Sequence, residues 1–274
     1  TWSSLFSRAS LVNRMPVLVW WVLVSCLGLL TYPLVYPVVW HLPAGGYALA
    51  RPLGLLFFGY LAWIAASLGV LPSSRGALIL VLAVLLVGGA AAACAQRHRL
   101  QVMLRAQWRS LLAIEACYLL AFGAMLAVRY GNPDLWHPAM GGEKPMDFAY
   151  LNAIIKSTIF PPYDPWFSGG YINYYYFGWV LFAAVTHLTG IIPAVSFNLA
   201  VATVFALAIL NSWAFASSAL SFFSRYLRMA TAWKPIGYGL LGSLFVCIIG
   251  NLDMARLIGT GQMGFAPVDN TGVL

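Results

Sequence analysis

The chain has 274 residues, of which 62% are hydrophobic and only 8% charged, and its mean hydropathy is +0.83. Soluble domains carry roughly a quarter of their residues as charged side chains, so this composition excludes a soluble enzyme, a disordered chain and a coiled coil. The net charge of +8 does not indicate a nucleic-acid partner, because the basic residues form short clusters between apolar runs. Such clusters are typical of membrane topology and of contact with lipid headgroups.

We therefore predict an all-α, polytopic helical membrane protein with about seven transmembrane helices and one long interfacial loop. Each apolar run is close to the roughly 20 residues that cross a bilayer. The runs are Pro16–Trp40, Leu53–Leu71, Ala77–Ala95, Leu111–Val128, Tyr176–Ile192, Val195–Phe222 and Pro235–Asp253.

Three features inside these runs carry expectations about packing. Pro33 and Pro37 each remove a backbone hydrogen bond, so we expect the first helix to bend or end there. Gly88 and Gly89 allow a neighbouring backbone to approach the third helix closely. Asn198 and Asn211 are expected to form hydrogen bonds between helices.

Glu115 lies near the start of the fourth run, just after the basic connector Gln96–Ser110. A carboxylate inside a membrane is by default a candidate functional residue. Glu115 is only a few residues from the expected interface, so we favour either snorkelling of its carboxylate to that interface or pairing with Arg105 or Arg109 of the connector.

The segment from Arg129 to Tyr175 differs from the rest of the chain. It holds Asp134, Glu143, Asp147 and Asp164, which are four of the seven acidic residues of the protein. Long ordered loops in compact proteins usually carry function. We therefore place any chemical function in the loop 129–175.

A helix is predicted within this loop from Phe148 to Phe160, with an apolar face that would rest on the membrane surface. Pro161-Pro162 would end it. Asp147 occupies the expected N-cap, where its carboxylate would accept free backbone N–H groups.

Two interpretations of Asp147 remain open at this stage: a helix cap, or a general base or metal ligand at the mouth of a membrane cavity. The second needs cations that could bind an anionic leaving group. Glu143, Lys144 and Lys156 are the charged neighbours in sequence.

The aromatic residues that follow also allow two interpretations. Trp166, Asn173 and the run Tyr174, Tyr175 and Tyr176 could form an interfacial aromatic belt or part of a binding site. If the three tyrosines lie on a helix, they point about 100° apart, so at least one must face protein and needs a hydrogen-bond partner.

Three strings in this region resemble a known family. They are Gly141-Gly142-Glu143-Lys144-Pro145-Met146-Asp147-Phe148, Phe160-Pro161-Pro162-Tyr163-Asp164-Pro165-Trp166 and Asn173-Tyr174-Tyr175-Tyr176-Phe177-Gly178. In this order they resemble the Chlor-Arch-YYY family, hydrophobic membrane proteins of unknown function named for a YYYxG motif. Phe197-Asn198-Leu199-Ala200 and Gly250-Asn251-Leu252 resemble its pattern as well. The resemblance implies a family domain over 111–274, preceded by an N-terminal transmembrane region of three spans over 1–110.

The family is considered distantly similar to the GT-C glycosyltransferases, which use polyprenyl-phosphate sugars at the extracytoplasmic face of a membrane. The resemblance implies an integral protein of the cytoplasmic membrane with its long loop outside. Asp147 would be the catalytic base or metal ligand, with Glu143 as a further catalytic candidate. Substrate would be bound by Lys144, Lys156, Asp164, Trp166, Asn173, Tyr174, Tyr175 and Tyr176. The identity of a metal or other cofactor stays open, a divalent ion being one candidate, and no sequence pattern points to haem or a pigment.

A second functional hypothesis is a non-catalytic structural or assembly subunit of a larger membrane complex, energy-transducing or photosynthetic. Small-residue helix faces and many aromatics favour it. The family usually continues into further spans and a second Asp-Leu-His motif, which this chain lacks. We therefore expect either the first part of a longer protein or a shortened member.

Overall fold

The computed structural model describes residues 2–135, 142–226 and 235–247, together with positions 249, 256 and 260. Throughout these residues the secondary structure is helical, with one isolated bridge between Tyr163 and Tyr171. The elements are α1 (Trp2–Leu5), α2 (Leu11–Arg14), α3 (Pro16–Val39), the 3₁₀ segment η1 (Pro43–Leu49), α4 (Ala50–Ser67), α5 (Arg75–Ala95), α6 (Arg97–Gly131), α7 (Lys144–Lys156), α8 (Phe177–Thr189), α9 (Pro193–Tyr226) and α10 (Pro235–Cys247).

The all-helical membrane fold predicted from composition is confirmed. Among the described helices, five are long and apolar enough to cross a bilayer: α3, η1 with α4, α5, α6 and α9. The other two expected spans contain the shorter apolar helices α8 and α10, of 13 residues each. At 1.5 Å per residue these reach about 20 Å, which is less than the roughly 30 Å of a hydrocarbon core.

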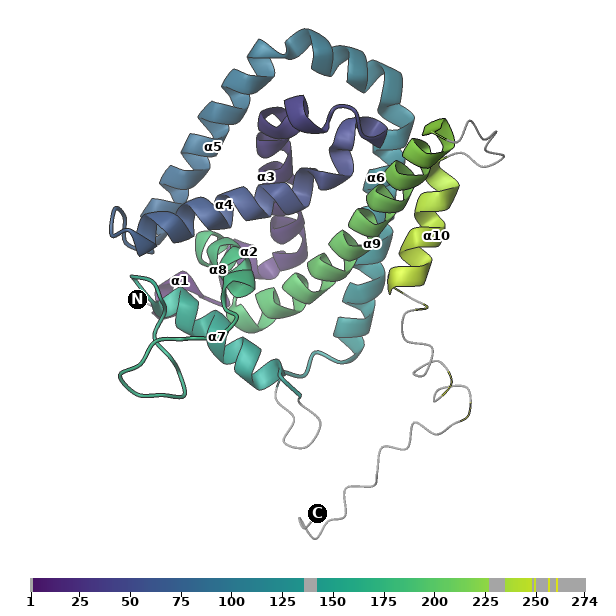
Figure 1. Ribbon diagram of the computed structural model, residues 1–274. Helices are drawn as coiled ribbons and strands as arrows, with labels where there is room; N and C mark the ends of the chain where they lie inside the picture. Colours follow the sequence, from purple (N-terminus) through teal and green to yellow (C-terminus); the bar gives the residue numbers. More distant parts are fainter. Residues whose placement is uncertain are drawn as a thin grey trace.

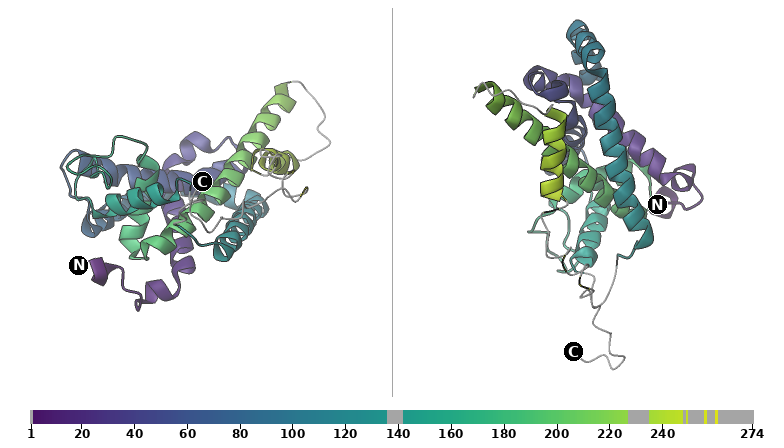
Figure 2. Two further views of the ribbon diagram at one scale, coloured as in Figure 1. Left: turned by 90° about the horizontal axis from the view of Figure 1, so that it is seen from below. Right: turned by 90° about the vertical axis from the view of Figure 1, so that its right-hand side faces the viewer.

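Helices α5 and α6 form an arch around α3 and α4, and α9 runs diagonally across the molecule beside α6 and α10 (Figure 1). Helices α7 and α8 lie with α1 and α2 at one end of the molecule (Figure 1), the end that faces the viewer in the left view of Figure 2. We call this end, where α3 and α5 begin and α6 ends, the loop side, and the opposite end the far side.

Both ends of α8 lie on the loop side. Near its start, the indole of Trp179 reaches Asp147 at the beginning of α7. At its end, the Leu188 carbonyl accepts a hydrogen bond from Arg75, and the Gly190 carbonyl accepts one from Asn13. Because Asn13 precedes α3 and Arg75 begins α5, the predicted span Tyr176–Ile192 does not cross the bundle.

The two prolines of the first span do not end it before Val39. Pro37 has no N–H, so the Pro33 carbonyl, four residues earlier, loses its helical partner. The Gln96 side chain replaces that partner by donating from Nε2 at 2.9 Å. This contact joins α3 to the junction of α5 and α6, where the expected connector Gln96–Ser110 proves to be helical and to form the first turns of α6.

Small residues allow close packing where α3 meets its neighbours. A Cβ atom added at Gly54 of α4 would lie 2.5 Å from the backbone of Leu27 in α3, and one at Gly28 would lie 3.0 Å from the backbone N of Arg51. A Cβ added at Gly89 of α5 would meet the Leu30 carbonyl oxygen, which confirms the predicted close approach at that glycine. Packing of this kind drives helix association in lipid, where burying apolar surface gives little gain.

One large core cluster draws side chains from α3, α4, α5, α6, α8 and α9. The Trp20 indole at its centre is fully buried and donates to Thr203 Oγ1 at 2.9 Å, linking α3 to α9. Outside the core, large apolar side chains stay exposed along the helices, as on α5 at Ile79, Leu80, Val84, Leu86 and Val87. Such faces fit contact with lipid.

The domain boundary predicted at residue 110, between the N-terminal transmembrane region and the family domain, remains a prediction.

The packing at Gly54 predicts a specific cost. The substitution Gly54→Ala should destabilise the protein by about 1–3 kcal/mol, because the added methyl group meets α3 backbone that cannot move aside. Gly123→Ala in α6 is the matched control, since a Cβ there meets nothing within 4 Å, and it should be neutral or stabilising by up to about 1 kcal/mol. Thermal melting in detergent measures both, and equal melting temperatures for the two variants would contradict the described packing.

Candidate functional site

Helix α7 begins four residues earlier than the sequence predicts. It starts at Lys144 with Glu143 as its N-cap, and Pro145 occupies its first turn. Asp147 therefore lies inside the helix, where its backbone N–H donates to the Glu143 carbonyl at 2.9 Å. The predicted N-cap role of Asp147 is wrong, because a proline in the first turn moves the helix start upstream of it.

The apolar face of α7 packs on protein and does not rest on the membrane surface. Leu151, Ile154 and Ile155 are buried against Phe6, Val180 and Phe197. The helix ends at Lys156, so Ile159, predicted on the same face, follows it and is 55% exposed. The predicted helix is present, and its apolar face is covered by protein.

Asp147 is held by an aromatic side chain of α8. Its Oδ1 accepts a hydrogen bond from Trp179 Nε1 at 3.1 Å. The Trp179 ring in turn stacks on Phe197 of α9, with centroids 4.9 Å apart and planes 14° from parallel. Glu143, one turn before Asp147, accepts a hydrogen bond from the Tyr175 hydroxyl at 2.9 Å.

Burial raises the pKa of Asp147 above its ordinary value of 3.8, and the neighbouring Glu143 carboxylate raises it further, while the Trp179 hydrogen bond opposes both effects. The same surroundings act on the phenols. Desolvation of the Tyr175 hydroxyl, together with its hydrogen bond to Glu143, raises the pKa of Tyr175 to about 12. Burial and the charge of Asp164 raise the pKa of Tyr150. The site is thus a carboxylate with raised basicity, flanked by protonated phenols.

The three consecutive tyrosines precede α8 and are not part of it. Tyr174 and Tyr175 are 58% and 46% exposed, and Tyr176 is the N-cap of α8. Tyr176 is the phenol that faces protein: its oxygen accepts a hydrogen bond from Trp63 Nε1 at 3.2 Å, and its ring stacks on Phe160. The expectation that one tyrosine would face inward is confirmed, although the helical geometry assumed for the three is wrong.

The segment between α7 and α8 is held by a turn at Asp164. Its carboxylate accepts the backbone N–H groups of Trp166 and Phe167 at 2.8 and 3.2 Å. The turn presents an exposed set of aromatic rings to the surroundings: Tyr163, Trp166, Phe167, Tyr171 and Tyr174. These fit the aromatic-belt interpretation. Asn173 beside them is exposed as well.

The two lysines do not converge on Asp147. Lys144 lies in the same first turn of α7 and is half-buried, whereas Lys156 ends the helix, about 14 Å away along its axis. The Lys156 ammonium lies 5.0 Å from the centre of the Trp2 ring.

Within the described part of the chain, no three His, Cys, Asp or Glu side chains form a group that could hold a metal ion. His137, Gly250, Asn251 and Asp253 lie outside the described residues.

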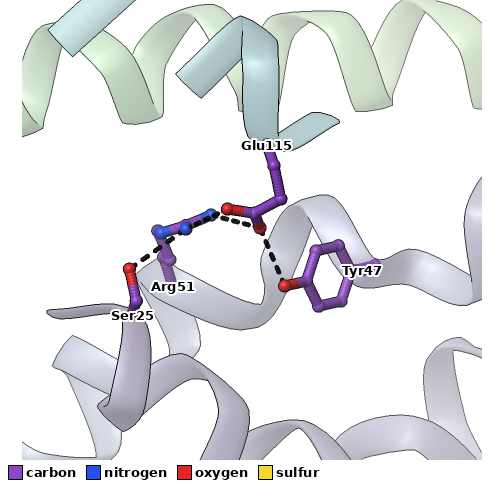
Figure 3. A network of polar contacts seen from close by, with 4 residues as sticks. All are labelled: Ser25, Tyr47, Arg51 and Glu115. Atoms are coloured by element: carbon purple, nitrogen blue, oxygen red, sulfur yellow. Dashed lines mark hydrogen bonds and ion pairs between the residues drawn. The ribbon is translucent and has the colours of Figure 1, made fainter. Parts of the chain in front are cut away.

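A second polar cluster lies inside the bundle (Figure 3). Glu115 of α6 forms an ion pair with Arg51 of α4 at 2.5 Å, and a second guanidinium nitrogen donates to the same carboxylate at 2.9 Å. The Tyr47 hydroxyl donates to Glu115 at 2.8 Å, and Arg51 also donates to Ser25 of α3. The predicted pairing of Glu115 with Arg105 or Arg109 is wrong, because the carboxylate faces inward to α4.

Arg51 is the residue that sequence reasoning missed as a partner. Its side chain is 5% exposed and lies 4.1 Å from the centre of the Tyr118 ring. The sequence feature that could have indicated this pairing is an isolated arginine beside an apolar run, in a chain whose first acidic residue is Glu115. A buried arginine needs a carboxylate, so Glu115 was a possible partner of Arg51 as well as of Arg105 and Arg109. The bidentate pair links α4 to α6 inside the bundle.

Asn198 also forms the contact expected of it. Its Oδ1 accepts a hydrogen bond from Arg129 Nε of α6 at 2.7 Å, on the loop side. Asn211 behaves differently, since its buried Oδ1 has no partner among the described residues.

Fold and site together define a multi-pass helical membrane protein with a carboxylate-aromatic cluster on its loop side. The chain belongs to the family of uncharacterized membrane proteins DUF2298, which matches residues 57–271. No curated protein and no solved structure matches the chain.

The buried ion pair predicts a large, recoverable loss of stability. Glu115→Gln should cost about 3–5 kcal/mol, because it leaves the Arg51 charge buried without a counter-charge. The double variant Arg51→Met with Glu115→Leu removes both charges and should recover most of that loss. Thermal melting in detergent tests this, and a double variant less stable than Glu115→Gln would contradict it.

The Asp147–Trp179 contact predicts a shift in acidity. Trp179→Phe keeps an aromatic ring against Phe197 but removes the donor that stabilises the charged carboxylate, so the pKa of Asp147 should rise further. Infrared titration of the carboxyl band measures the shift, with the exposed Trp166→Phe as the control. A fall in the pKa, or equal values in both variants, would contradict the described contact.

Proposed function

We propose that this protein acts on a lipid-phosphate-linked sugar at the membrane surface, as the resemblance to GT-C glycosyltransferases implies, with Asp147 as the general base. The observation that carries the proposal is the environment of Asp147. It is a partly buried carboxylate whose pKa is raised, and the Trp179 indole fixes its direction. A base of raised pKa accepts a proton from an acceptor hydroxyl more readily at neutral pH.

The surroundings of Asp147 give the other site residues distinct roles in this proposal. Glu143 keeps the region negative and, with Tyr175, borders the carboxylate at the start of α7. Lys144 is the nearest cation along the helix and is the residue we assign to the phosphate. The exposed aromatic rings of Trp166 and Tyr174 supply flat surfaces of the kind that sugars and lipid headgroups contact.

We further propose that the loop side is extracytoplasmic in a cytoplasmic membrane. Helix α9 starts on the loop side beside Arg129, and its 34 residues extend about 50 Å towards the far side (Figure 1). The orientation follows the resemblance, because basic residues occur at both ends of the bundle: Arg97 and Arg99 on the far side, and Arg8, Arg14 and Arg75 on the loop side.

The test is Asp147→Asn, which keeps the shape and can still accept the Trp179 hydrogen bond. Burial penalises the charged form of Asp147, so its contribution to stability falls as the pH rises above 3.8. Asp147→Asn removes that penalty and should melt at the same or a higher temperature at pH 7. Transfer, measured as release of polyprenyl phosphate from a labelled lipid-phosphate sugar, should fall by about 10²-fold or more.

Asp134→Asn is the matched comparison, because it removes another carboxylate of the loop 129–175 that has no role in the proposal, and transfer should be retained. If the wild-type protein is active and Asp147→Asn transfers sugar at the same rate, Asp147 is not the general base. If the wild-type protein releases no lipid phosphate from any donor tried, the hypothesis of a non-catalytic subunit in a larger membrane complex replaces this one.

A further inference from the structure

A groove lies on the far side, away from the carboxylate-aromatic cluster. It runs between the last turn of α3 and the first turns of α6 and has a volume of about 690 Å³. Its lining includes Pro37 and Trp40 of α3 and His98, Arg99, Val102 and Gln107 of α6. The two helices are held here by the contact between Gln96 and the Pro33 carbonyl.

The charge around this groove is positive, with no acidic residue near it in sequence. Arg97, His98, Arg99 and Arg105 follow one another on the first turns of α6 and are all exposed. The first acidic residue of the chain, Glu115, lies four or more turns from Arg97 and Arg99 and is paired with Arg51 inside the bundle. The groove therefore favours an anion.

Apolar side chains form part of the groove wall beside its charged and polar lining: Pro37, Val102 and Met103. Val102 is 54% exposed. Trp40 is 62% exposed at the end of α3, where an indole is suited to the depth of lipid headgroups. A ligand that fits must combine a negative headgroup with a hydrocarbon part.

We propose that this groove binds one anionic phospholipid of the surrounding bilayer. The phosphate lies against Arg99 and His98, and the acyl chains follow Val102 into the membrane. The site is independent of the loop-side chemistry, since it lies at the opposite ends of α3 and α6.

Binding is tested on the full chain in detergent by native mass spectrometry with phosphatidylglycerol and with phosphatidylcholine. The wild type should retain phosphatidylglycerol preferentially. The double variant Arg99→Gln with His98→Gln should weaken its binding at least about fivefold. Ala106→Trp, which fills the groove without changing charge, should weaken it too, and Arg8→Gln on the loop side is the control that should not.

Four results would overturn the proposal: equal binding of phosphatidylcholine, an equal loss in Arg8→Gln, undiminished binding in Ala106→Trp, or full competition by soluble glycerol phosphate at the same concentration. The last would mean that the groove binds a free anion and not a lipid. Thermal melting without added lipid checks that each variant is folded. If Ala106→Trp fails that check, the smaller Ala106→Leu takes its place and carries the same expectation.

Discussion

The ion pair between Arg51 and Glu115 is the interaction on which the arrangement of the bundle depends. A charge in the apolar core of a membrane is costly unless it is paired within the protein. Arg51 stands in the first turn of α4, where the helix dipole is itself unfavourable to a cation, so the carboxylate of α6 offsets two penalties at once. The pair allows α4 to begin beside the middle of α3, and the left-handed residues Ala44, Gly45 and Gly46 turn the chain so that Tyr47 reaches the same carboxylate.

Direct contacts between α4 and α8 fix the position of α8 on the loop side. Gly59 of α4 leaves room for Leu181 of α8, and Trp63, one turn further on, donates to Tyr176 at the N-terminus of that helix. Helix α8 then directs Trp179 at Asp147. The spanning helix α4 thereby holds in place the short helix α8, which does not cross the bundle. This support gives the Asp147 carboxylate of α7 a defined direction, while its burial raises its pKa.

Local patterns in the sequence predicted much of the fold, and long-range pairing could not be predicted. Apolar runs indicated α3, α4, α5, α6, α8, α9 and α10, and Gly89 predicted a close contact that depends only on the absence of a side chain. The start of α7 was misplaced because Asp147 and Glu143 are both plausible caps, and Pro145 decides between them. The partner of Glu115 lies 64 residues away, and two nearer arginines compete for it in sequence. The length of α8 was overestimated because apolar residues beyond its ends, such as Ile191, are buried in protein, which hydropathy cannot distinguish from burial in lipid.

The central claim, that α7 and α8 both lie on one side of the membrane, is tested most directly by cysteine accessibility at Ala194, just after α8. In a protein whose native cysteines are replaced, single cysteines are introduced at Trp166, Ala194 or His98 and treated with an impermeant thiol reagent in intact and in opened cells. The fold predicts that Ala194→Cys labels from the same side as Trp166→Cys and from the opposite side to His98→Cys. Labelling of Ala194→Cys from the side of His98→Cys would show that α8 crosses the membrane and would contradict the account.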